Sequence, residues 1–189
     1  MQRRDVLKSL AVVLGGAVSH ACSQALEVPA AQRVAVAGVM TDEQRAAVYR
    51  CADLIIPTTD TPGALEAGVD EFLDYVISVW YTEDEREVFF AGLAQMLDDA
   101  QSIYGQPFIA LKEPQQVALL QAAEAREPVS DPFAFGSSES GFFKKIKELT
   151  VTGYYTSEVG ATIERKYAPM PGFYDGDYKF SEVGRLWAS

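Results

Sequence analysis

Histidine and cysteine, which most often supply acid–base groups, nucleophiles and metal ligands, are nearly absent from this chain. The only histidine is His20, and the only cysteines are Cys22 and Cys51. This composition excludes Ser-His and Cys-His nucleophile pairs and the usual histidine-containing metal sites from the chain after residue 20. No phosphate-cradling glycine loop, Cys-x-x-Cys-His haem motif or multi-cysteine cluster spacing is present. We therefore predict no cofactor or metal site in this chain.

Carboxylates are the remaining candidates for acid–base chemistry. Asp98 is adjacent to Asp99, and Asp175 is two residues from Asp177. Such pairs are common on acidic surfaces, and the net charge of this chain is −11. Nothing in the spacing identifies either pair as an acid–base couple. We predict no catalytic residue, and an enzyme that uses carboxylates and tyrosines is the alternative.

The N-terminal residues have the pattern of an export signal. The pair Arg3-Arg4 is followed by a short apolar run at residues 10–18 and then by small residues. This arrangement is typical of a twin-arginine signal, and the run is shorter than the roughly 20 residues that span a bilayer. A short amphipathic helix of a cytoplasmic protein is the alternative. We expect residues 1–25 to direct the protein to the periplasm through the twin-arginine translocase.

The composition of the whole chain is that of an acidic globular protein. Its 189 residues are 48% hydrophobic and 11% aromatic, as in a folded domain. Residues 1–21 contain three basic side chains and one acidic one, so the remainder has a net charge near −13. A surface this acidic repels phosphate backbones and anionic membranes. We therefore expect no nucleic-acid partner.

The two cysteines have different expected fates. Cys51 lies on the apolar face of the first predicted helix, where an unpaired thiol is usually buried. A single bridge to Cys22 is also compatible with an oxidising compartment. Cys22 itself is removed with the signal, retained, or lipidated at a new N-terminus.

Helical patterns begin after an extended leader at residues 26–40. Thr41 and Thr82 each open a capping box, and Gly105 and Gly153 are expected to end helices. Apolar residues at helical spacing mark the faces expected to point inward. These residues are Ala47, Val48, Cys51, Leu54 and Ile55; Val69, Phe72, Leu73, Val76, Ile77 and Trp80; Phe89, Leu93, Met96, Leu97, Ala100 and Ile103; Val117 and Leu120; and Phe142, Phe143, Ile146 and Leu149.

Residues 41–189 are therefore predicted to form a single all-α domain, a compact bundle of about five helices with an irregular aromatic C-terminal tail. Ten of the 21 aromatic residues lie between positions 142 and 187. An irregular segment this aromatic must pack on an apolar surface, which is either the protein's own core or a groove on another chain.

Two further stretches have alternative interpretations. Three lysines lie opposite the apolar face of the last long helix: Lys144, Lys145 and Lys147. They form either a solvated face or the contact surface for an acidic partner. Residues 58–63, Thr-Thr-Asp-Thr-Pro-Gly, form a predicted loop whose side chains can bond nearby backbone amides. This loop either caps the following helix or binds a small molecule.

Three parts of the chain resemble the gluconate 2-dehydrogenase subunit 3 family. The first is ADLIIPTTDTPGA at residues 52–64, with AGV at 67–69. The second joins residues 142–150 to GYYTSEVGAT at 153–162, which is the more specific motif. The third contains PGFYDG at 171–176 and GRLWA at 184–188. The resemblance covers nearly the whole chain.

This resemblance implies the small subunit of a membrane-bound bacterial sugar or sugar-acid dehydrogenase, peripheral to the inner membrane through its complex. In that family the large subunit is a flavoprotein of the glucose-methanol-choline type, and a multihaem cytochrome c often accepts the electrons. FAD, and any iron–sulfur cluster, would then belong to the partner. The small subunit is not the catalytic chain; it supplies the twin-arginine signal and helps the flavoprotein mature.

The predicted functional residues are accordingly those of export and of assembly. Arg3 and Arg4 are assigned to export. Tyrosine and tryptophan are favoured interface anchors, so the predicted partner-surface residues are Tyr154, Tyr155, Tyr174 and Trp187. A stand-alone periplasmic small-molecule-binding protein or a carboxylate-based enzyme is the alternative function.

Overall fold

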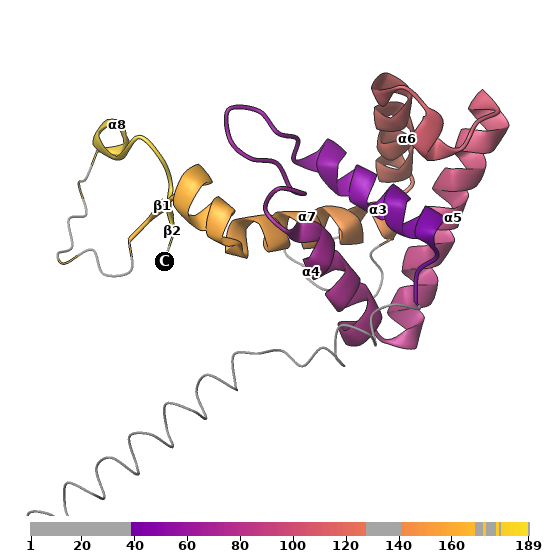
Figure 1. The fold of residues 1–189 in the computed structure, drawn as a ribbon, viewed down its shortest axis with the longest axis horizontal. Helices are drawn as coiled ribbons and strands as arrows, with labels where there is room; N and C mark the ends of the chain where they lie inside the picture. The colour runs from indigo at the N-terminus through magenta and orange to yellow at the C-terminus, as the bar shows by residue number, and fades with distance from the viewer. Residues whose placement is uncertain (1–38, 128–140, 169–171, 173–176, 178, 189) are drawn as a thin grey trace, which may run out of the picture. The chain divides into compact units, whose positions relative to one another are not determined.

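The computed structural model describes residues 39–127, 141–168, 172, 177 and 179–188 (Figure 1). The helical elements are α3 (Asp42–Ile55), α4 (Val69–Tyr75), the π-helix η1 (Val76–Trp80), α5 (Glu83–Tyr104), the 3-10 helix η2 (Phe108–Ala110), α6 (Glu113–Ala125), α7 (Phe142–Thr156), the π-helix η3 (Gly160–Glu164) and α8 (Phe180–Val183). Two short strands, β1 (Lys166–Tyr167) and β2 (Trp187–Ala188), pair in parallel. The predicted all-α fold is confirmed.

Helix α7 is the element around which the other long helices pack. It contacts α3, α4, α5 and α6, and Figure 1 shows it passing beside α3 and α4. Phe142, Ile146, Thr150 and Tyr154 recur every four residues along α7 and are all buried. Because side chains four apart share one helix face, this stripe gives α7 a continuous surface for its neighbours.

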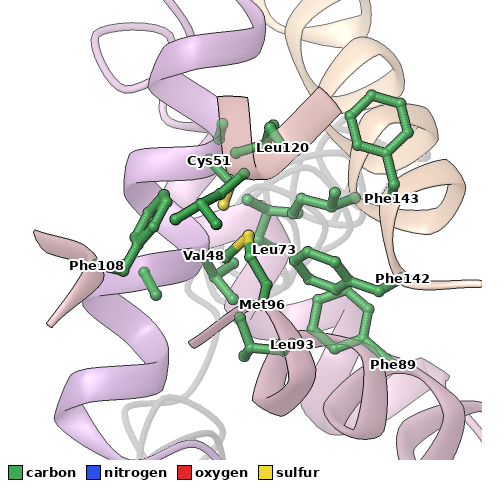
Figure 2. Close-up of a cluster of buried hydrophobic side chains, with 14 of the residues drawn as sticks. Val48, Cys51, Leu73, Phe89, Leu93, Met96, Phe108, Leu120, Phe142 and Phe143 are labelled. Carbon is green, nitrogen blue, oxygen red and sulfur yellow. The ribbon is translucent and has the colours of Figure 1, made fainter. Parts of the chain in front are cut away.

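The core lies between α7 and the helices that surround it. Figure 2 shows side chains of Val48, Cys51, Met96, Leu120 and others in one cluster. The rings of Phe89 and Phe142 meet edge to face with their centroids 5.1 Å apart, an arrangement that aromatic pairs prefer. The hydrophobic spacing in the sequence thus predicted most of the core correctly.

The predicted helix starts are confirmed in detail. The Thr41 hydroxyl accepts from the Gln44 amide at 3.2 Å, and the Gln44 side chain accepts from the Thr41 amide at 2.9 Å. Thr82 and Glu85 form the same reciprocal pair at the start of α5. Each pair satisfies two amides that the helix itself leaves without partners.

The prediction that Gly153 ends a helix is wrong, because α7 continues to Thr156. A Cβ atom at position 153 would lie 2.7 Å from Cδ1 of Phe72. Glycine is therefore required there because the ring of a neighbouring helix packs directly on the α7 backbone. The sequence shows the glycine but not which neighbour approaches it.

Trp80 was predicted to face inward and instead has 73% of its surface exposed. Leu73 and Ile77 of the same stretch are buried as predicted. The difference arises in η1, where the Tyr81 amide donates to the Val76 carbonyl five residues back at 3.0 Å. A π-turn accommodates one more residue than an α-turn, so the side chains at its end, including Trp80, are rotated away from the face that α-helical spacing predicts.

Two further orientations are corrected. Ile103, expected in the core, is 63% exposed in the last turn of α5. Lys145, expected on a solvated face, is only 6% exposed. Its ammonium lies 3.9 Å from Glu85 and 5.1 Å from the centre of the Tyr81 ring. A buried lysine requires such partners, because an unpaired ammonium is costly to remove from water.

Cys51 is a free, buried thiol, as the structural interpretation predicts. Cys22, the other cysteine of the sequence, lies outside the described residues. Burial raises the pKa of its thiol to about 12, because an apolar surrounding disfavours the thiolate. Among the described residues, no helix is both long enough and apolar enough to cross a bilayer.

Candidate partner-binding surface

The loop at residues 58–63 lies against the end of α7 and against η3. The Tyr154 hydroxyl donates to the Pro62 carbonyl at 2.8 Å, and the Thr61 hydroxyl donates to Glu164 at 2.8 Å. Burial raises the pKa of Tyr154, so its hydroxyl stays protonated and remains a donor. Two stretches that the sequence singles out, near residues 60 and 160, are therefore in direct contact.

The polar groups of this loop bond within the protein. Gly63 donates its amide to the Thr58 hydroxyl at 3.2 Å, and the same hydroxyl lies 3.3 Å from Glu66. Thr59 bonds its neighbour Asp60 at 3.0 Å. The loop does not cap α4, which begins after Gly68 without a side-chain cap. These bonds indicate that the loop has a structural role, because its hydroxyl groups form hydrogen bonds with other groups of the same protein.

A tight turn joins α7 to η3. The Ser157 hydroxyl donates to the Tyr154 carbonyl at 2.7 Å and accepts from the Gly160 amide at 3.0 Å. A Cβ atom on residue 160 would lie 1.9 Å from the Tyr154 carbonyl oxygen. Only glycine permits this approach, so Gly160 determines where the chain beyond η3 emerges.

Beyond this turn, large apolar side chains are exposed on several short elements. Next to the β1–β2 pair, the Lys166 backbone amide donates to the Leu186 carbonyl at 2.8 Å. The Arg185 side chain donates to the Ile163 carbonyl. Figure 1 shows α8, β1 and β2 near one another past the end of α7. Five of these residues are each 42 to 67% exposed: Ile163, Tyr167, Phe180, Leu186 and Trp187. We call them the C-terminal surface.

Cations stack on the aromatic rings of this segment. The Arg165 guanidinium lies 4.1 Å from the centre of the Tyr155 ring, and the Lys166 ammonium lies 4.6 Å from that of Trp187. Cation–π contacts of this kind fix the orientation of a ring and add modestly to stability. The exposed apolar residues are thus accompanied by positive charge, in a chain whose overall charge is −11.

The predicted partner-surface residues separate into three groups. Trp187 is exposed and Tyr155 is partly buried, so both remain predictions. The prediction that Tyr154 is a partner-surface residue is wrong, because only 2% of it is exposed and its ring packs in the core. Tyr174, together with the export residues Arg3 and Arg4, lies outside the described residues.

The carboxylate pairs do not assemble an acid–base couple in the described residues. Asp99 pairs with Arg126, whose hydrogen bond lowers the pKa of that carboxyl group. Asp98 is exposed on the same helix, and Asp175 lies outside the described residues. In this part of the chain no three acidic, cysteine or histidine side chains are placed to hold a metal ion.

Two shallow cavities lie beside α7. One, of about 170 Å³, is between α5, the end of α6 and the start of α7; the other, of about 210 Å³, is between α3, α6 and α7. Drug-sized ligands usually occupy roughly 300–1,000 Å³, so neither cavity resembles a developed small-molecule site. Their linings include Phe143, Arg126, Glu127 and Lys147.

Sequence reasoning missed Glu127, which caps α7 from the end of the preceding helical segment. Its carboxylate accepts from the amides of Gly141 and Phe143 at 2.8 Å and of Lys144 at 3.2 Å. A carboxylate suits the positive end of a helix. No short-range pattern reveals this cap, because Glu127 is 14 residues from Gly141.

The chain matches a known protein family. The family model described as gluconate 2-dehydrogenase subunit 3 matches residues 42–172, from the start of α3 to just beyond β1. No curated protein and no solved structure matches the chain.

Proposed function

Because the chain belongs to the gluconate 2-dehydrogenase subunit 3 family, we propose that it is a non-catalytic subunit of a sugar or sugar-acid dehydrogenase. In this proposal a separate flavoprotein of the glucose-methanol-choline type binds FAD and oxidises the substrate, and a multihaem cytochrome c is a further partner. The observation that carries the proposal is the family match over residues 42–172.

The C-terminal surface supports a role in assembly. Isolated exposed apolar residues are ordinary, but several on adjoining elements are typical of an interaction site. Phe180, Leu186 and Trp187 lie within eight residues of one another and are all exposed. We propose that the catalytic subunit covers this surface, so the tail packs partly on its own core and partly on another chain.

The N-terminal pattern supports a role in export. The twin-arginine route transports folded proteins, and the chain with the signal shows no cofactor motif of its own. We propose that this chain binds the folded flavoprotein in the cytoplasm, helps it mature and brings it to the periplasm. The complex would then be peripheral to the inner membrane.

The export role is tested by replacing Arg3 and Arg4 with lysine in a cell that also expresses the proposed flavoprotein partner. We expect the dehydrogenase activity to move from the periplasmic to the cytoplasmic fraction, because in this proposal the flavoprotein carries no export signal of its own. A signal-bearing reporter that uses the general secretory route is the control for fractionation. Normal periplasmic activity in the Arg3→Lys, Arg4→Lys variant would contradict the proposal.

The assembly role is tested by co-purification. The wild-type chain is expected to retain a flavin-containing subunit, and a Phe180→Asp, Leu186→Asp variant is expected to lose it, because carboxylates in an apolar interface are costly. Ile103→Asp, also on an exposed side chain, is the matched control and should retain the flavoprotein. A wild-type chain that purifies alone and oxidises a sugar without flavin would overturn the proposal in favour of an independent enzyme.

A further inference from the structure

A second group of exposed apolar residues lies in an acidic part of the sequence, whereas the C-terminal surface is accompanied by cations. Tyr75 and Val79 are each about half exposed and Trp80 is 73% exposed, at the junction of α4 and η1 with α5. Residues 70–87 contain seven carboxylates and one arginine. We call Tyr75, Val79 and Trp80, with the exposed Glu71, Asp84 and Glu87, the acidic tryptophan surface.

The position of Trp80 is fixed by the residues on both sides of it. The Tyr81 amide closes the π-turn on Val76 at 3.0 Å. The Tyr81 ring faces inward, with its centroid 6.0 Å from that of Phe89 and the Lys145 ammonium 5.1 Å away. Thr82 then begins α5 as a capping box. Because Tyr81 is held inside, Trp80 is presented outward on a rigid support.

The cations of this region are already paired, so its outer face is acidic. Arg86 donates to the Ser78 carbonyl at 3.1 Å and to Glu83 at 2.8 Å. Lys145 is buried against Glu85. Among the residues that the structure describes, no cation pairs with Glu71, Asp84 or Glu87. An exposed tryptophan therefore has unpaired carboxylates before it and after it in the sequence.

We infer that the acidic tryptophan surface is a second contact site for the catalytic subunit, whose matching face is an apolar pocket bordered by lysine or arginine. Trp80 is the anchor that enters the pocket, since a rigid tryptophan is a frequent hot-spot residue. The carboxylates steer association and exclude acidic partners. This inference rests on the proposed function and adds to it a site in the N-terminal half and the charge of the partner's face.

The charge also decides between a protein and a lipid surface. Aromatic side chains favour the interface of a membrane, but anionic lipids repel a carboxylate-rich patch. A basic protein pocket satisfies both the tryptophan and the acids. We therefore assign the surface to a protein partner.

The test is a titration of the purified full chain against its purified catalytic subunit at low and high salt. Trp80→Ala is expected to weaken binding by about 30-fold or more, the loss that defines a hot spot. The Glu71→Lys, Glu87→Lys variant is expected to slow association and to lose the salt dependence of the wild type. Circular dichroism and Tm should stay near the wild-type values, because all three side chains are exposed.

Matched controls lie elsewhere on α5. Ile103→Ala removes another exposed apolar side chain, and Asp98→Lys reverses a charge about three helical turns beyond Glu87; both should bind within about twofold of the wild type. Wild-type binding that Trp80→Ala leaves unchanged would overturn this inference alone. Trp80-dependent sedimentation with phosphatidylglycerol vesicles would also overturn it. No binding by the wild type would instead overturn the proposed function.

Discussion

The two exposed apolar surfaces differ in what supports them. The acidic tryptophan surface rests on α4 and η1, whose inner side chains Leu73 and Ile77 are fully buried in the core. The C-terminal surface rests on two-residue strands and short helices. Among the residues of β1 and β2, only Ala188 is buried. It is held to the bundle through the turn at Gly160 and the bond between Thr61 and Glu164.

This difference indicates how each surface responds to a change elsewhere in the protein. A surface on core helices should persist until the whole domain unfolds, whereas one held by a few local bonds can separate while the core remains folded. Both surfaces include residues of a π-helix, Val79 and Trp80 of η1 and Ile163 of η3, and π-helical turns often mark a functional position in helical proteins. The three predictions below test whether their stabilities can be separated.

The largest expected effect comes from Gly160→Ala. The added methyl group would collide with the Tyr154 carbonyl, so η3 must move, at a cost of about 1–3 kcal/mol. We expect hydrogen exchange to become faster in η3 and β1 while the amides of α4 and η1 stay protected. Val151→Ala, on the exposed side of α7, is the control. Equal loss of protection in α4 would show that the two surfaces are not independent.

A smaller effect is expected for Tyr154→Phe, which removes the hydrogen bond to the Pro62 carbonyl and leaves the ring in place. The loss of one such bond costs about 1 kcal/mol, which urea unfolding measures. Tyr167→Phe, at an exposed tyrosine of the C-terminal surface, should be neutral. If both variants unfold alike, the bond to the loop at residues 58–63 does not brace this region.

The smallest effect concerns pH and the support of Trp80. Hydrogen bonds from Thr82 lower the pKa of Glu85 below its ordinary value of 4.5, so its ionised form stabilises the folded state above that pH. This contribution is lost as the pH falls through the lowered pKa. The Tm difference between the wild type and Glu85→Gln should therefore be largest at neutral pH and should decrease as the pH falls below 4.5. A constant difference would contradict this assignment.

The sequence predicted the helices well because their signals are local. The capping boxes at Thr41 and Thr82 require only residues three positions apart, and the buried stripe of α7 follows the helical repeat. The two predictions that failed most clearly, the helix end at Gly153 and the inward orientation of Trp80, depend on information that is not local. One depends on a ring from another helix, and the other on an extra residue in a turn.

The candidate surfaces were only partly predictable for the same reason. The aromatic content of the tail indicates that it must be covered, and Trp187 is indeed exposed. Tyr154 has the same residue type as its neighbour Tyr155 but faces the core, since it continues the stripe of Phe142, Ile146 and Thr150. Extending that four-residue spacing by one step would have identified Tyr154 as buried.

The burial of Cys51 has a consequence for the proposed export role. Burial raises the pKa of the Cys51 thiol, which disfavours the reactive thiolate at neutral pH, and the residue has no exposed surface. Neither peroxide nor a disulfide-exchange enzyme can react with it unless α3 separates from the bundle. In the proposed export of the folded complex, this burial would keep the side chain reduced on the far side of the membrane without any dedicated reductant.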